Sequence, residues 1–429
     1  MKEVYILSAI RTPLGSFGGA LASVSATKLG ATAIKGALAK ANVDAQDVDE
    51  VFMGNVVSAN LGQAPARQAA IFAGIGENVP ATTVNKVCAS GMKSIALAAQ
   101  SIMLGMNDLV VAGGMENMSA IPFYVPKARW GNKFGDTTLV DGLTKDGLTD
   151  VYNECAMGVC ADKTATKYDI SREAQDEFAI NSYKRVAEAT EKGYLANEIV
   201  PVEVKSRRGV TVVSEDEEYK RVKFEKIPNL RPAFTKEGTV TAANASTIND
   251  GAAALIIGSE KYKDQAKFKI RSWSSHAQDP TWFTTAPVEA INKNLEKEGL
   301  SVSDIDLWEI NEAFAAVTMV AIKELNLEHS KVNIYGGGVS LGHPIGCSGT
   351  RIVVTLMNAL ENQNKKFGYH IVSMGKTFLY PMGIYSKKYK HLDQVPNGAT
   401  IAIPNDPTNQ GRALMILQDA GLIKLKKGE

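Results

Sequence analysis

The chain has 429 residues, with 47 Lys and Arg against 46 Asp and Glu, and 45% of its residues are hydrophobic. Balanced charge argues against a protein that binds nucleic acid or an anionic membrane surface, and the length predicts two or three structural units. The first apolar run soon reaches Arg11, which is too early for a signal peptide, and no run approaches the ~20 apolar residues of a membrane span. We therefore expect a cytoplasmic protein.

Residues 1–118 alternate predicted strands and helices. The expected strands are Val4–Ser8, Glu50–Asn55 and Leu109–Ala112, and the expected helices are Ala26–Ala41, Gln63–Ala73 and a segment after Cys88 that ends at Gly105. Such an alternation predicts a mostly parallel sheet with helices on both faces.

Residues 119–248 are richer in charge and turn residues and predict a long excursion from the sheet. One clear helix begins after Ser171, whose side chain is suited to cap it. The acidic run Glu215–Tyr219 is interpreted as a solvated face rather than a site. Cys155 and Cys160 have no histidine near them in the sequence, so we interpret them as packed thiols and predict no metal site.

From residue 249 the alternation returns. The expected strands are Leu255–Ile257, Phe268–Ser272, Ile305–Ile310 and Val332–Tyr335, and the expected helices are Val288–Glu298, one opened by Asn311, and Ser348–Leu360. Both halves contain a strand, a turn with a reactive side chain and a helix. This arrangement predicts an α/β protein made of two similar layered halves that face each other, with the excursion inserted between them.

Two reactive side chains stand out. Cys88 lies just before a predicted helix, where free N–H groups and the helix dipole would stabilise its thiolate near neutral pH. His343 lies in a glycine-rich turn before another helix, and a cysteine and a histidine brought together by the fold can perform acyl transfer. Taken singly, Cys88 could also be a packed thiol and His343 a packed histidine. Asn311, which follows a predicted strand and opens a predicted helix, could be an ordinary helix cap.

Long motifs in this order resemble the thiolase family from residue 1 to about 367. They are Ile-Arg-Thr-Pro-Leu-Gly at 10–15, Val-Cys-Ala-Ser-Gly-Met at 87–92, Thr-Val-Thr-Ala-Ala-Asn-Ala-Ser at 239–246, Asn-Glu-Ala-Phe-Ala at 311–315 and Gly-Gly-Gly-Val-Ser-Leu-Gly-His-Pro-Ile-Gly at 336–346. Asp-Glu-Glu-Tyr-Lys-Arg-Val at 216–222 resembles the acetyl-CoA acetyltransferases, especially the mitochondrial acetoacetyl-CoA type. The resemblance implies a thiolase fold with an N-terminal half at 1–118 and 249–270, a loop domain at 119–248 and an incomplete C-terminal half at 271–367.

The resemblance also implies roles for individual residues. Cys88 would be the acylated nucleophile, His343 would accept its proton, and Asn311 would position a water at the first oxyanion. Residues implied to contact the substrate are Arg221 toward the nucleotide, Ala242 and Ser246 along the pantetheine, and Phe234, Phe283, Met157 and Phe314 around the acyl group. The implied partners are acetyl-CoA and acetoacetyl-CoA in a homo-oligomer, a dimer or a tetramer, without nucleic acid or membrane. No cofactor besides the coenzyme A thioester is implied, and a potassium requirement is left open.

The pattern departs from the family in its second half. Such thiolases carry a second cysteine in a Cys-Xaa-Gly-Gly-Gly turn, which removes a proton from the methyl carbon of the second acetyl-CoA. No cysteine follows Cys347 in the printed sequence, and Cys347 lies only four residues after His343. His370 offers another base, but its neighbours match no thiolase turn. Ala156 stands where related enzymes often have histidine. We therefore expect impaired condensation.

The last residues resemble another family. Segments at 375–381, 384–388 and 403–414 resemble the methionine-binding lipoproteins of ABC importers, so 368–429 is interpreted as a solute-binding-protein-like fragment joined to a truncated thiolase. A recombined, frameshifted or misassembled gene would produce such a junction. The alternatives are a 3-ketoacyl-CoA thiolase of another chain length, a ketoacyl synthase relative, a methionine-binding protein and an inactive chimera.

Overall fold

The computed structural model describes residues 2–372 and 375–376, with side chains to residue 370. These residues belong to one compact unit, Met1–Pro381. Apart from its first residues, the segment 368–429 that we interpret as a solute-binding-protein-like fragment lies outside the described residues.

The larger sheet has the order β13-β1-β12-β5-β3-β4, with a short β2 paired to β12. Its strands are β1 (Val4–Arg11), β2 (Gly15–Ser16), β3 (Glu50–Gly54), β4 (Ala81–Val84), β5 (Leu109–Asn117), β12 (Asn249–Gly258) and β13 (Phe268–Ile270). Only β3 pairs in parallel, with β4 and β5, whereas β12 runs antiparallel to both β1 and β5. The strands β1, β3, β4 and β5 of residues 1–118 therefore all run in the same direction, as predicted, but the sheet is mixed, because β12 returns from the excursion and enters its middle in the opposite direction.

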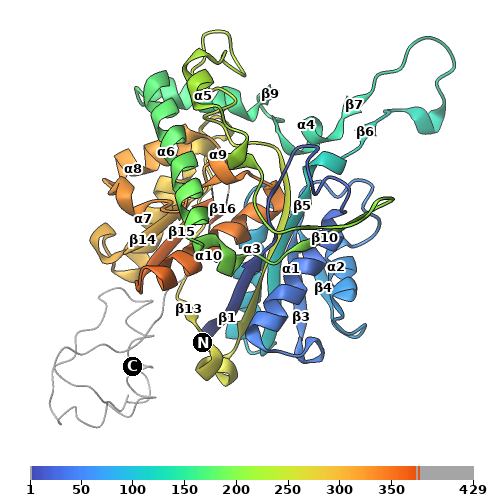
Figure 1. Cartoon of the computed structure of the whole chain (residues 1–429), viewed down its shortest axis with the longest axis vertical. Coiled ribbons are helices and arrows are strands. Elements are labelled where there is room, and N and C mark those ends of the chain that lie inside the picture. The colour runs from blue at the N-terminus through green and yellow to red at the C-terminus, as the bar shows by residue number, and fades with distance from the viewer. Residues whose placement is uncertain (1, 373–374, 377–429) are drawn as a thin grey trace, which may run out of the picture. The chain divides into compact units, whose positions relative to one another are not determined.

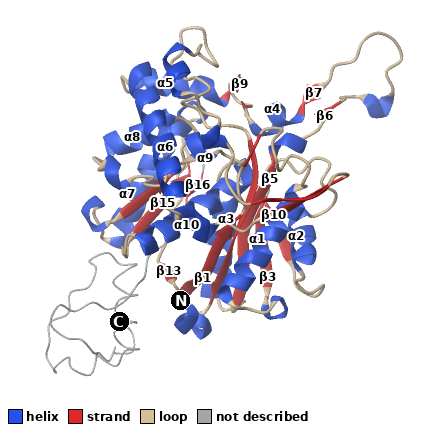
Figure 2. Ribbon diagram, viewed as in Figure 1, coloured by secondary structure: helices blue, strands red, loops and turns tan. Residues whose placement is uncertain are grey.

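Helices separate and cover two sheets (Figures 1 and 2). One face of the larger sheet packs on α1 (Ala26–Ala41) and α2 (Pro65–Ala73), and the other face packs on α3 (Ser90–Met103) and α10 (Ile345–Asn362). Helix α10 also packs on the smaller sheet. That sheet consists of β14 (Leu307–Ile310), β15 (Gly368–Val372) and β16 (Gly375–Lys376), and α7 (Ala286–Glu298) and α8 (Ala315–Glu324) share its apolar cluster. Two of the catalytic candidates, Cys88 and His343, lie just before α3 and α10.

The periodic helices were predicted well. Helix α1 has the predicted bounds because Ser25 Oγ accepts from Lys28 N and Asn42 ends the helix at φ 53°. The strand predicted at Val332–Tyr335 was wrong. Val332 forms only an isolated bridge with Trp308, and the chain then turns at Asn333, where φ is 48°. The side chain of Asn333 bonds to both Ile310 N and Ile310 O at 2.8 Å, so the apolar run is buried as a turn.

Residues 119–248 form short elements and two longer helices. They are β6 (Phe123–Tyr124), β7 (Val140–Asp141), α4 (Gly142–Gly147), β8 (Thr149–Asp150), β9 (Cys155–Ala156), α5 (Met157–Lys167), α6 (Arg172–Glu191), β10 (Val202–Ser206) and β11 (Gly209–Val213). Ser171 caps α6 as predicted, by accepting from Ala174 N. Figure 1 shows the β6–β7 segment projecting from the rest, whereas α5 and α6 contact α8. None of the described helices has the length and apolar character needed to cross a membrane.

The acidic run after residue 214 is not a solvated face, so that prediction was wrong. Asp216 is buried and forms two hydrogen bonds with the guanidinium of Arg11, at 2.7 and 2.9 Å, while Glu198 accepts from Arg11 Nε at 2.6 Å. Glu217 accepts from the backbone N–H groups of Ser16 and Ala20. The run therefore fixes the loop after β1, and its partners lie some 200 residues away in sequence.

Removal of the Asp216 carboxylate is expected to destabilise the protein strongly. Asp216→Ala leaves the Arg11 charge buried with only Glu198 as its counter-charge, and breaking a buried pair costs about 3–5 kcal/mol. Glu188→Ala is the matched control, because its pair with Lys192 is exposed and is worth at most about 1 kcal/mol. Urea denaturation followed by circular dichroism measures both; equal midpoints for the two variants would contradict the prediction.

Candidate active site

Cys88 lies in a tight turn between β4 and α3. Val87 has a positive φ of 48°, and the Ser90 hydroxyl stabilises the turn by accepting from Lys86 N at 2.8 Å and donating to Val87 O at 2.6 Å. The Cys88 side chain is half-buried and packs against Met92 of α3 and Ile352 of α10. The turn thus presents a thiol where the two central helices meet.

The pKa of Cys88 is raised to about 12, mainly by burial; the backbone N–H of Cys88 opposes the rise, and the nearby Glu116 adds to it. The prediction of a thiolate stabilised by the helix N-terminus was therefore wrong. Helix α3 begins only at Ser90 with Ala89 as its cap, so Cys88 precedes the free N–H groups and desolvation dominates. A base must remove the proton.

His343 is oriented toward this thiol by its turn. Gly342 has φ 107°, and a Cβ there would lie 2.3 Å from Asn249 Cγ, so only glycine fits. Asn249 Oδ1 in turn accepts from the backbone N–H of His343 at 2.9 Å. The imidazole Nε2 consequently lies 3.2 Å from Cys88 Sγ. Burial lowers the pKa of His343 to about 3, with a smaller effect from Arg351, so the ring is neutral and able to accept a proton.

Ser348 selects the tautomer of His343. Its hydroxyl donates to the carbonyl of Pro344 at 3.0 Å and lies 2.6 Å from His343 Nδ1. A carbonyl only accepts, so the Ser348 proton is directed at Pro344 and its oxygen accepts from Nδ1–H. The free lone pair of the ring is then on Nε2, which faces Cys88. The sequence analysis missed Ser348; its place five residues after His343, in the first turn of a helix, was the available signal.

The family resemblance implies that Cys88 is acylated, and Ser348→Ala is expected to slow that acylation about 5- to 30-fold without unfolding the chain. The lost hydrogen bond is worth about 1 kcal/mol, and the non-productive tautomer becomes accessible. The rate of thiol modification by acetyl-CoA, followed by intact mass, measures the effect. Ser101→Ala is the matched control, since that buried hydroxyl also donates to a carbonyl of its own helix, Ala98 O at 2.9 Å. Equal rates for both variants, or no recovery in Ser348→Thr, would contradict the assignment.

Glu116 connects the two halves beside this pair. Its carboxylate accepts from Val56 N, Val57 N, Asn55 Nδ2 and, across the halves, Gly346 N at the start of α10. Burial raises the pKa of Glu116 to about 7, although these donors favour the ionised form. Glu116 therefore fixes the start of α10, and with it the loop that contains His343. Little in the sequence indicates this role, since Glu116 lies near the end of a buried strand.

Asn311 follows β14 and is fully buried, but it does not cap a helix, because α8 begins at Ala315 with Phe314 as its cap. Neither Oδ1 nor Nδ2 of Asn311 has a hydrogen-bond partner among the described residues. The next residue, Glu312, accepts from Asn333, Ser182 and Val339 N, which fixes the backbone at this point. A buried amide without partners is costly, so this side chain is suited to bind a water or a substrate group.

The four side chains predicted to surround the acyl group lie together. Met157, Phe283 and Phe314 belong to one apolar cluster, and Phe234 meets the Phe314 ring edge to face at 5.9 Å. Phe234 also lies over Gly158, where an added Cβ would be 2.2 Å from its ring. The wall is therefore built from α5, the start of α8, the 3-10 helix Pro280–Thr285 and the loop that contains Phe234.

The remaining predicted residues lie nearer the surface. Ser246 donates its backbone N–H to Ala313 O at 3.0 Å, beside Phe314, and Ala242 is exposed in the same loop. Arg221 is exposed after the turn Glu218–Lys220, and no described contact links it to the acyl wall.

His370, the other base that the sequence offers, is buried on β15. Burial lowers its pKa to about 3, and neither ring nitrogen has a partner among the described residues.

A buried neutral imidazole facing a thiol defines a class: cysteine-dependent enzymes in which the imidazole takes the thiol proton. The sequence profile described as "Thiolase, N-terminal domain" matches residues 4–261, and "Thiolase, C-terminal domain" matches residues 264–378. The chain belongs to the thiolase family.

Related proteins agree over most of the chain. A probable acetyl-CoA acetyltransferase of Dictyostelium discoideum is 51% identical over 380 residues, covering 87% of this chain and 92% of the relative. The acetyl-CoA acetyltransferase of Saccharomyces cerevisiae is 52% identical over 384 residues, covering 87% and 96%. The crystal structure of Acat5 thiolase from Ascaris suum in complex with coenzyme A matches with a TM-score of 0.83 and 44% identity, over 88% of this chain and 99% of that one. The predicted thiolase fold is thereby confirmed.

The tail matches a different family. The profile described as "NlpA lipoprotein" covers residues 356–429, which confirms the lipoprotein resemblance predicted for the tail. It overlaps the thiolase match at 356–378. The boundary at residue 367, like the other domain boundaries, stays a prediction.

Proposed function

We propose that the chain is an acyltransferase of the acetyl-CoA acetyltransferase type that works through an acyl-Cys88 intermediate. The observation that carries the proposal is the 3.2 Å approach of His343 Nε2 to Cys88 Sγ, with Ser348 orienting the ring. The names of the relatives support acetyl-CoA as the acyl donor.

In the first half-reaction His343 Nε2 takes the proton from Cys88 Sγ, and the sulfur attacks the thioester carbonyl. The tetrahedral intermediate collapses, the carbon–sulfur bond to coenzyme A breaks, and the leaving thiolate takes the proton back from His343. Asn311 would donate, through a bound water, to the oxyanion, as its unpartnered buried amide allows. Donors aimed at developing charge contribute about 3–4 kcal/mol each.

The coenzyme A arm would run along the loop that contains Ala242 and Ser246 toward Arg221. Ala242 and Arg221 are exposed and Ser246 is half-buried, as a surface channel for a flexible arm requires. The apolar wall of Met157, Phe234, Phe283 and Phe314 would enclose the acyl group. A longer acyl chain remains the alternative, because Ala156, exposed next to Met157, leaves room where related enzymes often have histidine.

Isotope exchange tests the proposal. Labelled coenzyme A should enter unlabelled acetyl-CoA in the presence of the protein alone, because an acyl-enzyme exchanges coenzyme A without a second acetyl group. A comparison of acetyl-CoA with longer acyl-CoA thioesters decides the chain length, and acetylated acyl carrier protein as donor would favour the ketoacyl synthase alternative. Heat on titration with methionine would favour the binding-protein alternative. Absence of exchange with every thioester would refute the proposal.

The assembly and compartment are also proposals. Trp130, Phe134 and Leu139 are exposed on the β6–β7 segment, which supports a homo-oligomer, to be tested by light scattering.

A cytoplasmic location is supported by four free cysteines, while the names of relatives include both cytosolic and mitochondrial forms. A potassium requirement was left open through the resemblance of residues 216–222 to the mitochondrial type. Tyr219 of that motif packs against an apolar cluster, so we derive no catalytic step from a potassium ion.

A further inference from the structure

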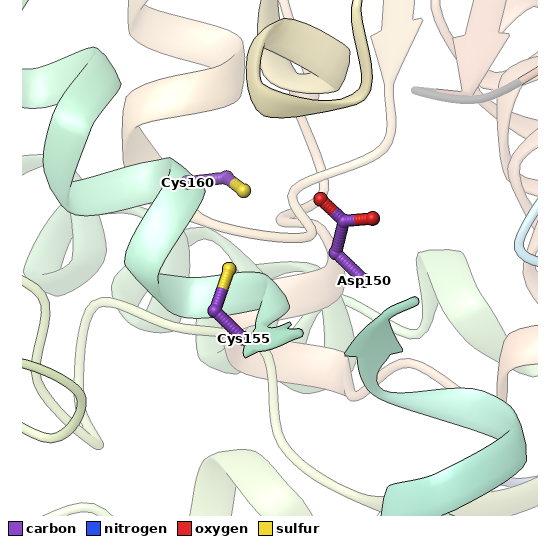
Figure 3. Close-up of side chains that lie close together, drawn as sticks. All are labelled: Asp150, Cys155 and Cys160. Atoms are coloured by element: carbon purple, nitrogen blue, oxygen red, sulfur yellow. The ribbon is translucent and has the colours of Figure 1, made fainter. Parts of the chain in front are cut away.

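Three side chains with metal-ligating atoms lie together next to the proposed acyl wall. Asp150 ends β8, Cys155 begins β9, and Cys160 is the fourth residue of α5. A carboxylate oxygen of Asp150 and the two Sγ atoms all lie within 4.8 Å of one another. Figure 3 shows the two thiols and the carboxylate drawn together from these three elements.

Local structure explains why they meet. Strands β8 and β9 pair antiparallel with Asp150 directly opposite Cys155. Ala156 caps α5, so Cys155 and Cys160 occupy the position before the cap and the fourth helical position, whose side chains commonly contact each other at helix starts. The sequence analysis considered only the two cysteines and the absence of histidine, and it left Asp150 out.

The electrostatics of the cluster favour a cation. Asp150 and Cys160 are buried, at 6% and 0% exposure, and Cys155 is half-buried. Asp150 accepts from Tyr152 N and Asn153 Nδ2, but no ion pair links it to a lysine or arginine among the described residues. Two thiols thus lie beside a buried carboxylate that has no cationic side chain paired with it among the described residues. A metal ion would supply the missing positive charge.

We propose that Asp150, Cys155 and Cys160 bind one thiophilic divalent cation of the Zn²⁺ class. Both thiols release their protons to solvent as two metal–sulfur bonds and one metal–oxygen bond form, and the fourth position is left to water or another ligand. A tetrahedral site places its ligand atoms roughly 3.5–3.8 Å apart, so the cluster has to contract by at most about 1 Å. Two thiolates select Zn²⁺ over Mg²⁺ or Ca²⁺.

The site would influence the acyl wall, since Cys155 and Cys160 pack in the same apolar cluster as Phe283 and Phe314. The turn between the two strands provides access, because Val151 and Tyr152 are 59% and 80% exposed. The proposal replaces the sequence-based expectation of two packed thiols without a metal, and it does not depend on the proposed acyl transfer.

Titration with Co²⁺ tests the site in the full chain carrying Cys88→Ala. This substitution is needed because Cys88 and His343 form a thiol–imidazole pair elsewhere in the chain that would also bind the probe. We expect one Co²⁺ per chain, with sulfur-to-cobalt charge-transfer absorption and the intense visible bands of a four-coordinate ion, both removed by one equivalent of Zn²⁺. Zn²⁺ should also raise the melting temperature of this variant. No charge-transfer band at saturating Co²⁺ would overturn the proposal.

Ligand variants in the same background identify the residues. Cys155→Ser and Asp150→Asn should each weaken Co²⁺ binding at least tenfold, and Cys155→Ser should also halve the charge-transfer absorption. Cys347→Ser is the matched control, since it removes a buried free thiol outside the cluster and should leave binding unchanged. Circular dichroism verifies that each variant is folded. Unchanged affinity in both folded ligand variants would refute the site.

Discussion

Cys88→Ala is expected to abolish transfer of an acetyl group from acetyl-CoA to the protein, a loss on the order of 10⁴-fold or more in the exchange rate. The reason is direct: Cys88 Sγ is the sulfur that faces a neutral imidazole Nε2, at 3.2 Å. Intact-protein mass spectrometry after incubation with acetyl-CoA should show one added acetyl group in the unmodified chain and none in the variant. Labelled coenzyme A exchange gives the rate.

Two comparisons make this test specific. Cys155→Ala and Cys347→Ala remove other free thiols and should keep the acetyl adduct. The pH profile is the second comparison. Because the pKa of His343 is lowered to about 3 and that of Cys88 is raised to about 12, the neutral pair persists between these values, and acylation should be nearly flat from pH 8 to pH 10, above the pKa of about 7 of the neighbouring Glu116. An adduct that persists in Cys88→Ala would refute the role of Cys88. A rate that rises steeply around pH 8 would instead indicate an ordinary free thiolate.

Local signals predicted local structure. The predicted bounds of helix α1 match the structure, in which Ser25 caps the helix and its small apolar residues face the sheet. The turns that contain Cys88 and His343 were also found, since both precede predicted helices. One contains a cysteine at the helix start, and the other contains a histidine among glycines. Features that depend on distant partners were not predictable in this way. The burial of Asp216 requires Arg11, and the antiparallel entry of β12 between β1 and β5 leaves no mark on its own sequence.

The same contrast between local signals and distant partners applies to the candidate active site. The family resemblance named Cys88, His343 and Asn311 and implied that His343 accepts the proton of Cys88, but the sequence could not say which ring nitrogen accepts it. Only the structure relates the pKa of Cys88 to its burial and the tautomer of His343 to Ser348 and Pro344. Asp150 was missed for the same reason, since strand pairing brings it opposite Cys155. A short periodic pattern reports which face is buried, whereas a charge or a proton depends on every group the fold brings near.

A second large functional loss is expected in the second half-reaction of the unmodified chain. The chain should exchange coenzyme A through acyl-Cys88 but form acetoacetyl-CoA at a rate about 10²–10⁴-fold below that of a complete relative, which is the usual contribution of a positioned base. The family resemblance implies a second cysteine in a Cys-Xaa-Gly-Gly-Gly turn, and the printed sequence has no cysteine after Cys347. The lipoprotein match at 356–429 occupies the region where that turn would follow.

A graft tests whether the missing cysteine is the cause. Residues 368–429 would be replaced by the corresponding C-terminal segment of the Dictyostelium discoideum relative, which is 51% identical to this chain. We expect condensation to rise about 10²–10⁴-fold while coenzyme A exchange changes only a few-fold, because the Cys88–His343 pair precedes the graft. The control graft carries alanine at the second cysteine and should exchange without condensing. Equal condensation by the original chain and the active graft would show that another residue, with His370 the first to test, supplies the base. A gain in both reactions together would show instead that the graft restored folding rather than chemistry.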